Sequence, residues 1–186
     1  ARVSAKLREK HPNLSIEIYS ESTRAIARRL NDFSLDAGIL YFDDGDPETT
    51  EKLYEERYVF IAPNSLKILK DKQITWEEVA QFPLCLLTQN MRNRQLIDQQ
   101  FLELGISPNI VTEASDFTGV LAQVALGNAA TIAPVSVAET FLDLKSTVHL
   151  DLTHPVMIHS VGLSIKDQSP VLPIIKALRQ AVKAAL

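Results

Sequence analysis

Apolar residues recur along the chain with the spacings of alternating strands and helices. Residues 14–19 alternate apolar and polar side chains, which is typical of a half-buried strand. Residues 37–42 form a continuous apolar run, as expected of a buried parallel strand. Between them, Ile26 and Leu30 lie one helical turn apart and predict a helix. Strands and helices that alternate with short joints favour an α/β fold with parallel crossovers.

The same strand–helix–strand pattern occurs twice. One copy begins at Pro12 and the other at Pro108, an offset of 108 − 12 = 96 residues, and both begin with Pro-Asn. Few other positions are identical, so the copies either share an ancestor or share only common turn and cap residues. Under both interpretations the pattern predicts two lobes with one such unit in each.

The rest of the chain also alternates predicted helices and strands. Further helices are predicted over 1–10, 75–82 and 93–104, from Pro134 and from about Pro170, and further strands over 58–63, 84–87, 109–114, 129–133, 147–152 and 156–165. Thr75 and Glu78 have the spacing of a capping box, and Gly105 and Gly127 are expected helix stops. No glycine- or serine-rich linker is visible, so ordinary strands must connect the two lobes.

Composition and charge narrow the class of protein. The chain has 186 residues, of which 46% are hydrophobic and 23% charged, and its net charge is −4. A DNA-binding surface is normally basic, and beyond Arg28-Arg29 there is no basic run, so this stretch is not expected to contact nucleic acid. No secretory signal is visible, and no apolar run approaches ~18 residues, so no membrane association is expected. The single cysteine, Cys85, excludes an internal disulfide, suits a reducing cytosol and is expected to be a small buried residue.

Several short motifs, taken in order, resemble the effector-binding domain of LysR-type transcriptional regulators. They are Leu7…His11-Pro12-Asn13-Leu14-Ser15-Ile16, Ser22, Leu30, Leu35-Asp36-Ala37-Gly38-Ile39, Leu53-Tyr54-Glu55-Glu56-Arg57-Tyr58-Val59, Phe82-Pro83-Leu84, Phe101…Gly105…Pro108 and Val124…Gly127-Asn128…Ile132-Ala133-Pro134. The resemblance implies a two-lobed periplasmic-binding-protein-like (type 2) fold with two crossover strands. Lobe I would be residues 1–62 plus 161–186, and lobe II residues 63–160. The family's N-terminal winged helix-turn-helix and linker helix, and the first strand of its effector domain, are not found in this sequence.

Ligands of open α/β sheets bind beyond the carboxyl ends of strands, where helix N-termini present free N–H groups. That rule selects as effector-binding residues Ser22, Thr23, Tyr41, Thr88, Gln89, Asn90, Asp116, Phe117 and Pro134. These residues converge only if the two lobes face each other across a cleft.

The candidates differ in strength. Thr88 and Gln89 are the stronger ones, because hydroxyl and amide groups orient small anions without a fixed charge. Ser22, and Ser115 or Asp116, can act as helix caps alone or as caps that also contact the ligand. Arg92 and Arg94 either clamp a carboxylate or are solvated residues at the start of a polar helix.

The resemblance implies a ligand-sensing domain. A small metabolite, expected to be an anion such as a carboxylate, would bind between the lobes, shift their orientation and control DNA binding by the full-length protein. It also implies a cytoplasmic regulator that contacts promoter DNA through its N-terminal domain and forms homodimers, possibly tetramers. Val3 and Leu7 on the opening helix are either a dimer surface or part of the core.

A solute-binding protein and an enzyme are the two alternatives to a sensor domain. The alternative is a solute-binding protein of a transport system with the same fold, which needs an export signal. An enzyme is disfavoured because no acid–base pair or nucleophile motif is found. No cofactor or metal is expected, since His149, His154 and His159 are spaced by five residues and do not converge in a strand.

Overall fold

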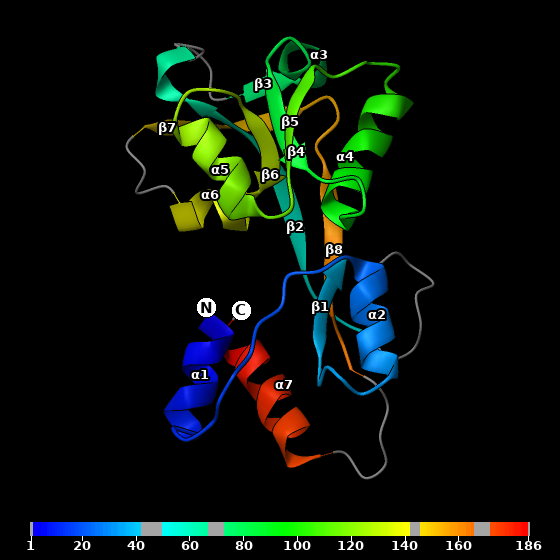
Figure 1. The fold of residues 1–186 in the computed structure, drawn as a ribbon, viewed down its shortest axis with the longest axis vertical. Helices are drawn as coiled ribbons and strands as arrows, with labels where there is room; N and C mark the ends of the chain where they lie inside the picture. Colours follow the sequence, from blue (N-terminus) through cyan, green and yellow to red (C-terminus); the bar gives the residue numbers. More distant parts are fainter. Residues whose placement is uncertain (1, 42–49, 67–72, 142–145, 166–171, 186) are drawn as a thin grey trace. The chain divides into compact units, whose positions relative to one another are not determined.

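The computed structural model describes residues 2–41, 50–66, 73–141, 146–165 and 172–185. The chain divides into two compact units, Ala1–Glu55 with Ser160–Leu186 (unit 1) and Glu56–His159 (unit 2). Strands β2 (Thr50–Pro63) and β8 (Ile158–Ser164) continue from one unit into the other (Figure 1). Within the described residues, no helix is both long and apolar enough to cross a membrane.

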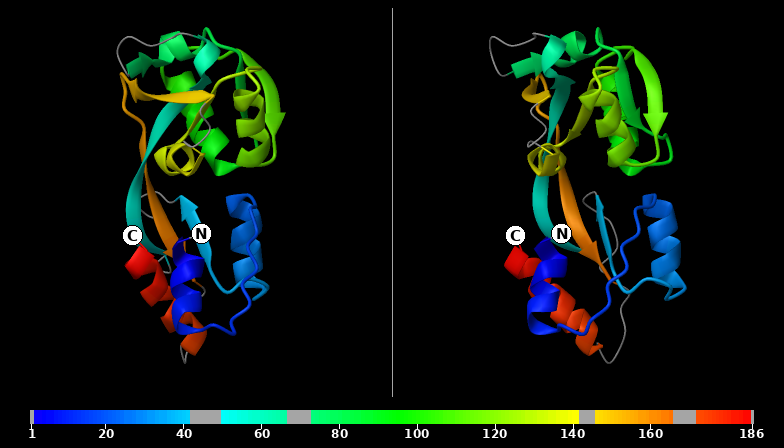
Figure 2. Two further views of the ribbon diagram at one scale, coloured as in Figure 1. Left: turned by 90° about the vertical axis from the view of Figure 1, so that its left-hand side faces the viewer. Right: turned by 60° about the vertical axis from the view of Figure 1, so that its left-hand side comes forward.

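Besides parts of β2 and β8, unit 1 contains three helices and a short strand in its described part. They are α1 (Arg2–Lys10), α2 (Thr23–Asn31), β1 (Gly38–Tyr41) and α7 (Pro173–Ala185). Helix α1 lies against α7, as Figure 2 shows, and the core beneath them contains Leu163, Ile175 and Val182. Leu7 is buried and Val3 packs against this core, so the apolar face of α1 is used for core packing.

Two strand predictions in unit 1 are wrong. Residues 14–19 form no strand, and the Ile18 side chain is 77% exposed. An alternating pattern yields a strand only where a neighbouring strand accepts its backbone hydrogen bonds. The second strand forms as β1, but it pairs antiparallel with β8, from Gly38↔Ser164 to Tyr41↔Val161. Ile39 is 52% exposed, so β1 is not the buried parallel strand that its apolar run predicted.

Unit 2 contains most of the regular structure. Besides parts of β2 and β8 it comprises η1 (Asn64–Leu66), β3 (Gln73–Thr75), α3 (Trp76–Val79), β4 (Leu84–Leu87), α4 (Arg92–Glu103), β5 (Ile110–Ala114), α5 (Phe117–Ala125), β6 (Thr131–Pro134), α6 (Val135–Phe141) and β7 (Thr147–Thr153). Strand β4 runs parallel to β5, and its Leu84 forms an isolated parallel bridge with Ala130, the residue before β6. Strand β2 pairs antiparallel with both β6 and β7, and β3 pairs parallel with β7. The strand pairings of unit 2 are therefore mixed.

Local signals in the sequence explain where the helices of unit 2 begin and end. Thr75 and Glu78 form the predicted capping box at the start of α3. Gly105 (φ +68°) and Gly127 (φ +81°) adopt the left-handed conformation just after α4 and α5, as their positions predicted. The buried Trp76 ring packs edge-on against Phe101 of α4, with centroids 5.0 Å apart, and its indole N–H donates to the Pro155 carbonyl oxygen at 2.9 Å. These contacts fix α3 and α4 against the core of unit 2.

The repeated pattern is only partly reproduced in the structure. In both copies a capping residue starts a helix that leads into a strand, Ser22–α2–β1 in unit 1 and Asp116–α5–β6 in unit 2. The strand that precedes the cap forms in the second copy, as β5, and does not form in the first. The structural correspondence is therefore limited to the cap, helix and second strand.

Candidate functional site

Three strands of unit 2, β4, β5 and β6, have their carboxyl ends at Leu87, Ala114 and Pro134. Strand β4 pairs parallel with β5, and Leu84 of β4 forms a parallel bridge with Ala130, the residue before β6, so the three strands run in the same direction. The Thr88 N–H donates to the Ala114 carbonyl oxygen at 3.0 Å. This bond joins the start of the β4–α4 loop (residues 88–91) to the last residue of β5, directly before the β5–α5 loop (residues 115–116).

The N-terminus of α4 has no side-chain cap. Its N-cap residue is Met91, which makes no side-chain hydrogen bond to the helix. Thr88, Gln89 and Asn90 lie directly before it, with Thr88 half-buried and the two amides exposed. Uncapped N–H groups and the helix dipole favour an anion at this position. The loop therefore combines hydroxyl and amide side chains with a helix N-terminus that its N-cap side chain, Met91, does not cap.

The N-terminus of α5 differs because a carboxylate already occupies it. Asp116 Oδ1 accepts a hydrogen bond from the Gly119 N–H at 2.9 Å, so Asp116 rather than Ser115 is the cap. A negative charge at this point satisfies the helix dipole and leaves less attraction for an anionic ligand. Phe117, the first residue of α5, is half-buried and packs against core residues such as Val120 and Leu121.

The third strand end, at Pro134, adjoins an acidic residue that sequence reasoning missed. Pro134 is buried and lies opposite Tyr58 in the β2–β6 pair. Two residues later, the Ser136 hydroxyl donates a hydrogen bond to the buried Glu56 carboxylate. A glutamate at the start of an apolar strand was the available signal, because buried carboxylates normally have a hydrogen-bonding partner.

Arg94 is neither solvated nor available to clamp a ligand. Its side chain is 4% exposed, and Nη1 donates to the Leu87 carbonyl oxygen at 2.8 Å. It forms ion pairs with Glu113 on β5 and, through Nε at 2.7 Å, with Asp98 one turn along α4. Burial lowers the pKa of Arg94, but the hydrogen bonds that it donates to Glu113 and Asp98 outweigh this effect, and the net shift of the pKa is upward. Both alternatives expected for Arg94 are therefore wrong.

Asn93 is a second polar residue of α4 that is buried. Its Nδ2 donates to the Tyr58 hydroxyl at 3.0 Å, which links α4 to β2 within unit 2. Tyr58 also packs edge-on against His159, with ring centroids 5.9 Å apart. Together, Asn93 and Arg94 anchor the first turn of α4 through its side chains, while its N-terminal amides have no side-chain cap.

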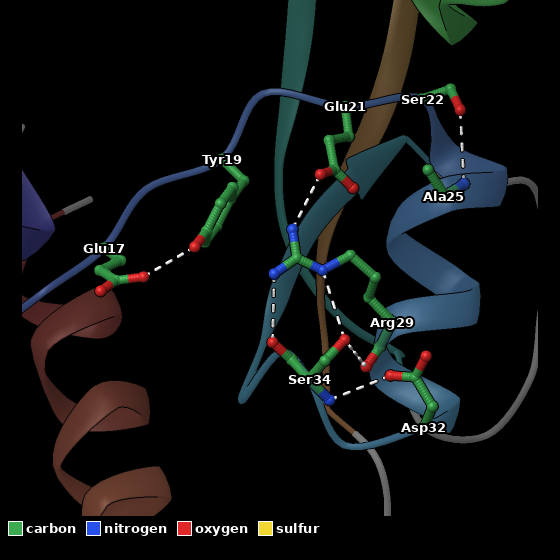
Figure 3. Close-up of polar contacts among 8 residues, drawn as sticks. All are labelled: Glu17, Tyr19, Glu21, Ser22, Ala25, Arg29, Asp32 and Ser34. Carbon is green, nitrogen blue, oxygen red and sulfur yellow. Dashed lines mark hydrogen bonds and ion pairs between the residues drawn. The ribbon is translucent and has the colours of Figure 1, made fainter.

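Ser22, Thr23 and Tyr41 belong to unit 1. Ser22 Oγ accepts a hydrogen bond from the Ala25 N–H at 3.3 Å, which confirms it as the cap of α2 (Figure 3). Thr23, the first residue of α2, and Tyr41, the last residue of β1, are both half-buried. The structure thus places three predicted site residues in unit 1 and the other six in unit 2, where they follow the ends of β4, β5 and β6.

An arginine on α2 fixes the segment that leads to Ser22. Arg29 Nη1 donates to the Glu21 carboxylate at 2.8 Å, and its guanidinium lies over the Tyr19 ring, 4.0 Å from the centroid. Its other bonds reach the backbone and hydroxyl oxygens of Ser34 (Figure 3). The hydrogen bond that Arg29 donates to Glu21 raises the pKa of Arg29. Irregular residues 17–22 are therefore held in place by side chains where no sheet partner holds them.

Two α/β units joined by two strands, with polar loops beyond the strand ends, define the class of two-lobed α/β binding domains. The profile of the LysR substrate binding domain matches residues 1–186, and the chain belongs to that family. The chain has the mixed α/β, type 2 periplasmic-binding-protein-like fold of that family. Among the residues that the structure describes, no cluster of three or more His, Cys, Asp and Glu side chains is placed to hold a metal ion.

Relatives of this chain include proteins named as transcriptional regulators. CysB of Haemophilus influenzae is 30% identical over 156 residues, which cover 82% of this chain and 47% of that protein. A probable RuBisCO transcriptional regulator of Trieres chinensis is 26% identical over 156 residues, which cover 78% of this chain and 50% of that protein. The chain thus spans about half the length of these relatives.

Solved structures with the same fold include domains with bound ligands. The effector-binding domain of QuiR in complex with shikimate has a TM-score of 0.76 at 18% identity, covering 98% of this chain and 87% of that chain. The Synechocystis PCC6803 CcmR regulatory domain in complex with 2-PG has a TM-score of 0.83 at 11% identity, covering 98% of this chain and 88% of that chain. The cofactor-binding domain of the Cbl transcriptional regulator has a TM-score of 0.80 at 21% identity, with 99% and 81% covered.

Proposed function

We propose that this chain is the effector-sensing domain of a LysR-type transcriptional regulator and that its effector is a small organic anion. The observation that carries the proposal is the uncapped N-terminus of α4 directly after Thr88, Gln89 and Asn90, in a domain of this family. The QuiR and CcmR domains, which share the fold, are described in complex with shikimate and 2-PG. The named relatives are regulators, which supports this function over transport or catalysis.

The candidate residues take different roles in this proposal. Thr88, Gln89 and Asn90 donate hydrogen bonds to the anion, together with the first N–H groups of α4. Asp116 orients α5 as its cap, and Phe117 and Pro134 supply apolar surface beside it. Ser22, Thr23 and Tyr41 of unit 1 are further proposed effector contacts, with Ser22 serving both as cap and as ligand contact.

In the full-length protein, a separate segment contacts promoter DNA, and the effector changes how tightly that segment binds. The regulator acts in the cytoplasm and forms homodimers or tetramers. For the effector to act as a switch, it must bind one conformational state more tightly than the other, because equal affinity shifts nothing. A tenfold difference in affinity corresponds to about 1.4 kcal/mol of bias between the two states.

A thermal-shift screen with a Thr88→Val variant tests the site. The 186-residue chain is scanned against small organic acids, including shikimate, and the variant is scanned beside it. Among the described residues the Thr88 hydroxyl makes no hydrogen bond, so its removal should leave the melting temperature of the free domain within about 1–2 °C of the wild type. It should, however, abolish the shift that an effector produces in the wild type.

Ser22→Ala provides the contrast. This change removes the cap of α2 and should cost about 1 kcal/mol of unfolding free energy before any ligand is added. A Thr88→Val domain that responds to acids like the wild type would refute the assignment of the β4–α4 loop. A wild-type domain that responds to no organic acid would refute the proposed ligand class.

A further inference from the structure

Arg94 connects the two loops on which the proposed function depends. Its guanidinium donates hydrogen bonds to three places in unit 2: the last residue of β4, the next-to-last residue of β5, and the following turn of α4. Leu87, whose carbonyl oxygen it binds, immediately precedes Thr88. Glu113 lies two residues before Ser115 and three before Asp116. One guanidinium group therefore joins the starting points of both loops.

Arg94 binds next to the backbone hydrogen bond that joins the ends of β4 and β5. The Thr88 N–H bonds to the Ala114 carbonyl oxygen, and the Leu87 and Glu113 groups that Arg94 binds are the adjacent residues on each strand. At this end of the parallel β4–β5 ladder, the two loops are thus linked by one backbone hydrogen bond and by the buried Arg94 guanidinium, whose carboxylate partners Glu113 and Asp98 are partly exposed. Opposite charges and charge-assisted hydrogen bonds in a buried site hold their geometry more firmly than neutral ones.

The chemistry requires arginine at this position. Its Nε and Nη1 point to different partners at once, Asp98 on one side and Leu87 with Glu113 on the other. A lysine ammonium is a point charge on a flexible stem and does not reproduce the fixed fork of a guanidinium. Since Nε and Nη1 are committed to protein atoms, they are not the groups that recognise the effector.

We propose that Arg94 is a positioning residue for effector binding, which sets the distance between the β4–α4 loop and the β5–α5 loop. It acts through the backbone of Leu87 and the side chain of Glu113 and does not touch the effector. Its consequence for ligand affinity rests on the proposed function, whereas its effect on the two loops does not.

Amide hydrogen exchange on the 186-residue chain tests the positioning role without a ligand. In an Arg94→Met variant, the amides of Thr88 and Gly119, which bond to Ala114 and Asp116, should exchange at least about tenfold faster than in the wild type. Amides of the sheet core, such as Val59, should change by less than about twofold. Arg57→Met is the matched control, because Arg57 forms an exposed ion pair with Asp151 in the same unit and should affect neither loop.

A second variant covers the case in which Arg94→Met fails to fold. Arg94→Lys keeps the charge and one hydrogen-bonding direction, so exchange at Thr88 should lie between the wild type and the Met variant. Unchanged exchange at Thr88 would overturn the proposal. An equal acceleration at Thr88 and Val59 would overturn it as well, because Arg94 would then contribute only to global stability.

Calorimetric titration with shikimate and with 2-PG adds the functional readout. If either probe binds the wild type, Arg94→Lys should raise its dissociation constant by about tenfold or more, and Arg57→Met should leave it unchanged. Equal affinities of the wild type and Arg94→Lys would overturn the role in binding. If neither probe binds the wild type, the ligand class of the proposed function is contradicted for these compounds, and the exchange comparison still decides the role of Arg94.

Discussion

Cys85 lies in β4, the strand that leads directly to Thr88 of the proposed site, and its side chain is 0% exposed. It packs with Leu87, Val120 and Ala129, and burial raises the pKa of its thiol. The reactive form of cysteine is the thiolate, so a buried thiol with a raised pKa is inert. The buried role that the sequence predicted for Cys85 is confirmed.

A thiol reagent provides the corresponding test. Native protein should react with Ellman's reagent at least about 100-fold more slowly than protein unfolded in guanidinium, which should release one equivalent of chromophore. The native rate should follow the rate of unfolding, because the sulfur is reached only when the core opens. Stoichiometric labelling of the native protein within minutes would show that β4 is accessible and the core assignment wrong.

The structural role of a single residue was predictable where its hydrogen-bonding partners are close to it in the sequence. The capping roles of Ser22, Asp116 and Thr75 follow from short polar side chains directly before an apolar helix, and the structure confirms all three. Arg94 was not predictable, because its burial depends on Glu113, which lies 19 residues away along the chain. A charged residue at a helix start is usually solvated, and only the tertiary structure shows that this one is paired.

At the level of elements, the segment before α2 illustrates how side chains substitute for a sheet partner. Residues 17–22 have no regular structure, yet Glu21 is bonded to Arg29, and Tyr19 contacts both Glu17 and Arg29 (Figure 3). If these contacts hold the segment in place, their removal should loosen it without unfolding the core of unit 1.

Limited proteolysis with a glutamate-specific protease checks this expectation. Cleavage after Glu17 and Glu21 should be several-fold faster in Arg29→Ala than in the wild type, because the segment must detach to enter the protease. Arg28→Ala is the control, since Arg28 is an exposed neighbour on the same helix. Equal cleavage rates in Arg29→Ala and Arg28→Ala would mean that the Arg29 contacts do not restrain residues 17–22.

Element types were easier to predict than strand pairing. All seven described α-helices lie where apolar spacing and cap residues predicted helices, within a few residues at their ends. The 3-10 helix η1 and strand β3 were not predicted, and β2 begins at Thr50, before the predicted strand 58–63. For β1 and residues 14–19, the identity and direction of the neighbouring strand decide the outcome. Pairing is a property of distant segments such as β1 and β8, and an apolar run alone does not specify which strand it meets.

At the scale of the whole molecule, the order of motifs carried more information than any one of them. The α/β class followed from alternating strand and helix patterns, and the family followed from short motifs distributed from Leu7 to Pro134. The loops of the candidate site were located by the rule that ligands bind beyond strand ends. What that rule did not supply is the second layer of contacts, in which Glu56, Asn93 and Arg94 support those loops from below the surface.

The distribution of charge over the whole chain leads to the final prediction. The net charge is −4, and many of the described cations are already paired with carboxylates. These pairs are Lys6–Glu9, Arg29–Glu21, Lys52–Glu55, Arg57–Asp151, Arg94–Asp98, Arg94–Glu113, Arg179–Glu51 and Lys183–Glu51. Binding to duplex DNA depends on unpaired Lys and Arg that displace counterions from the phosphates, so this chain offers little attraction to DNA.

The 186-residue chain should therefore show no salt-dependent retention on immobilised promoter DNA, with any dissociation constant weaker than about 10⁻⁴ M at physiological salt. A basic protein run on the same column is the positive control, and its elution should shift with salt concentration. Saturable binding by the 186-residue chain that weakens as salt rises would place a DNA contact within this domain. In that case the assignment of promoter recognition to another segment of the full-length regulator would have to be abandoned, because the domain itself would carry the basic surface that its composition argues against.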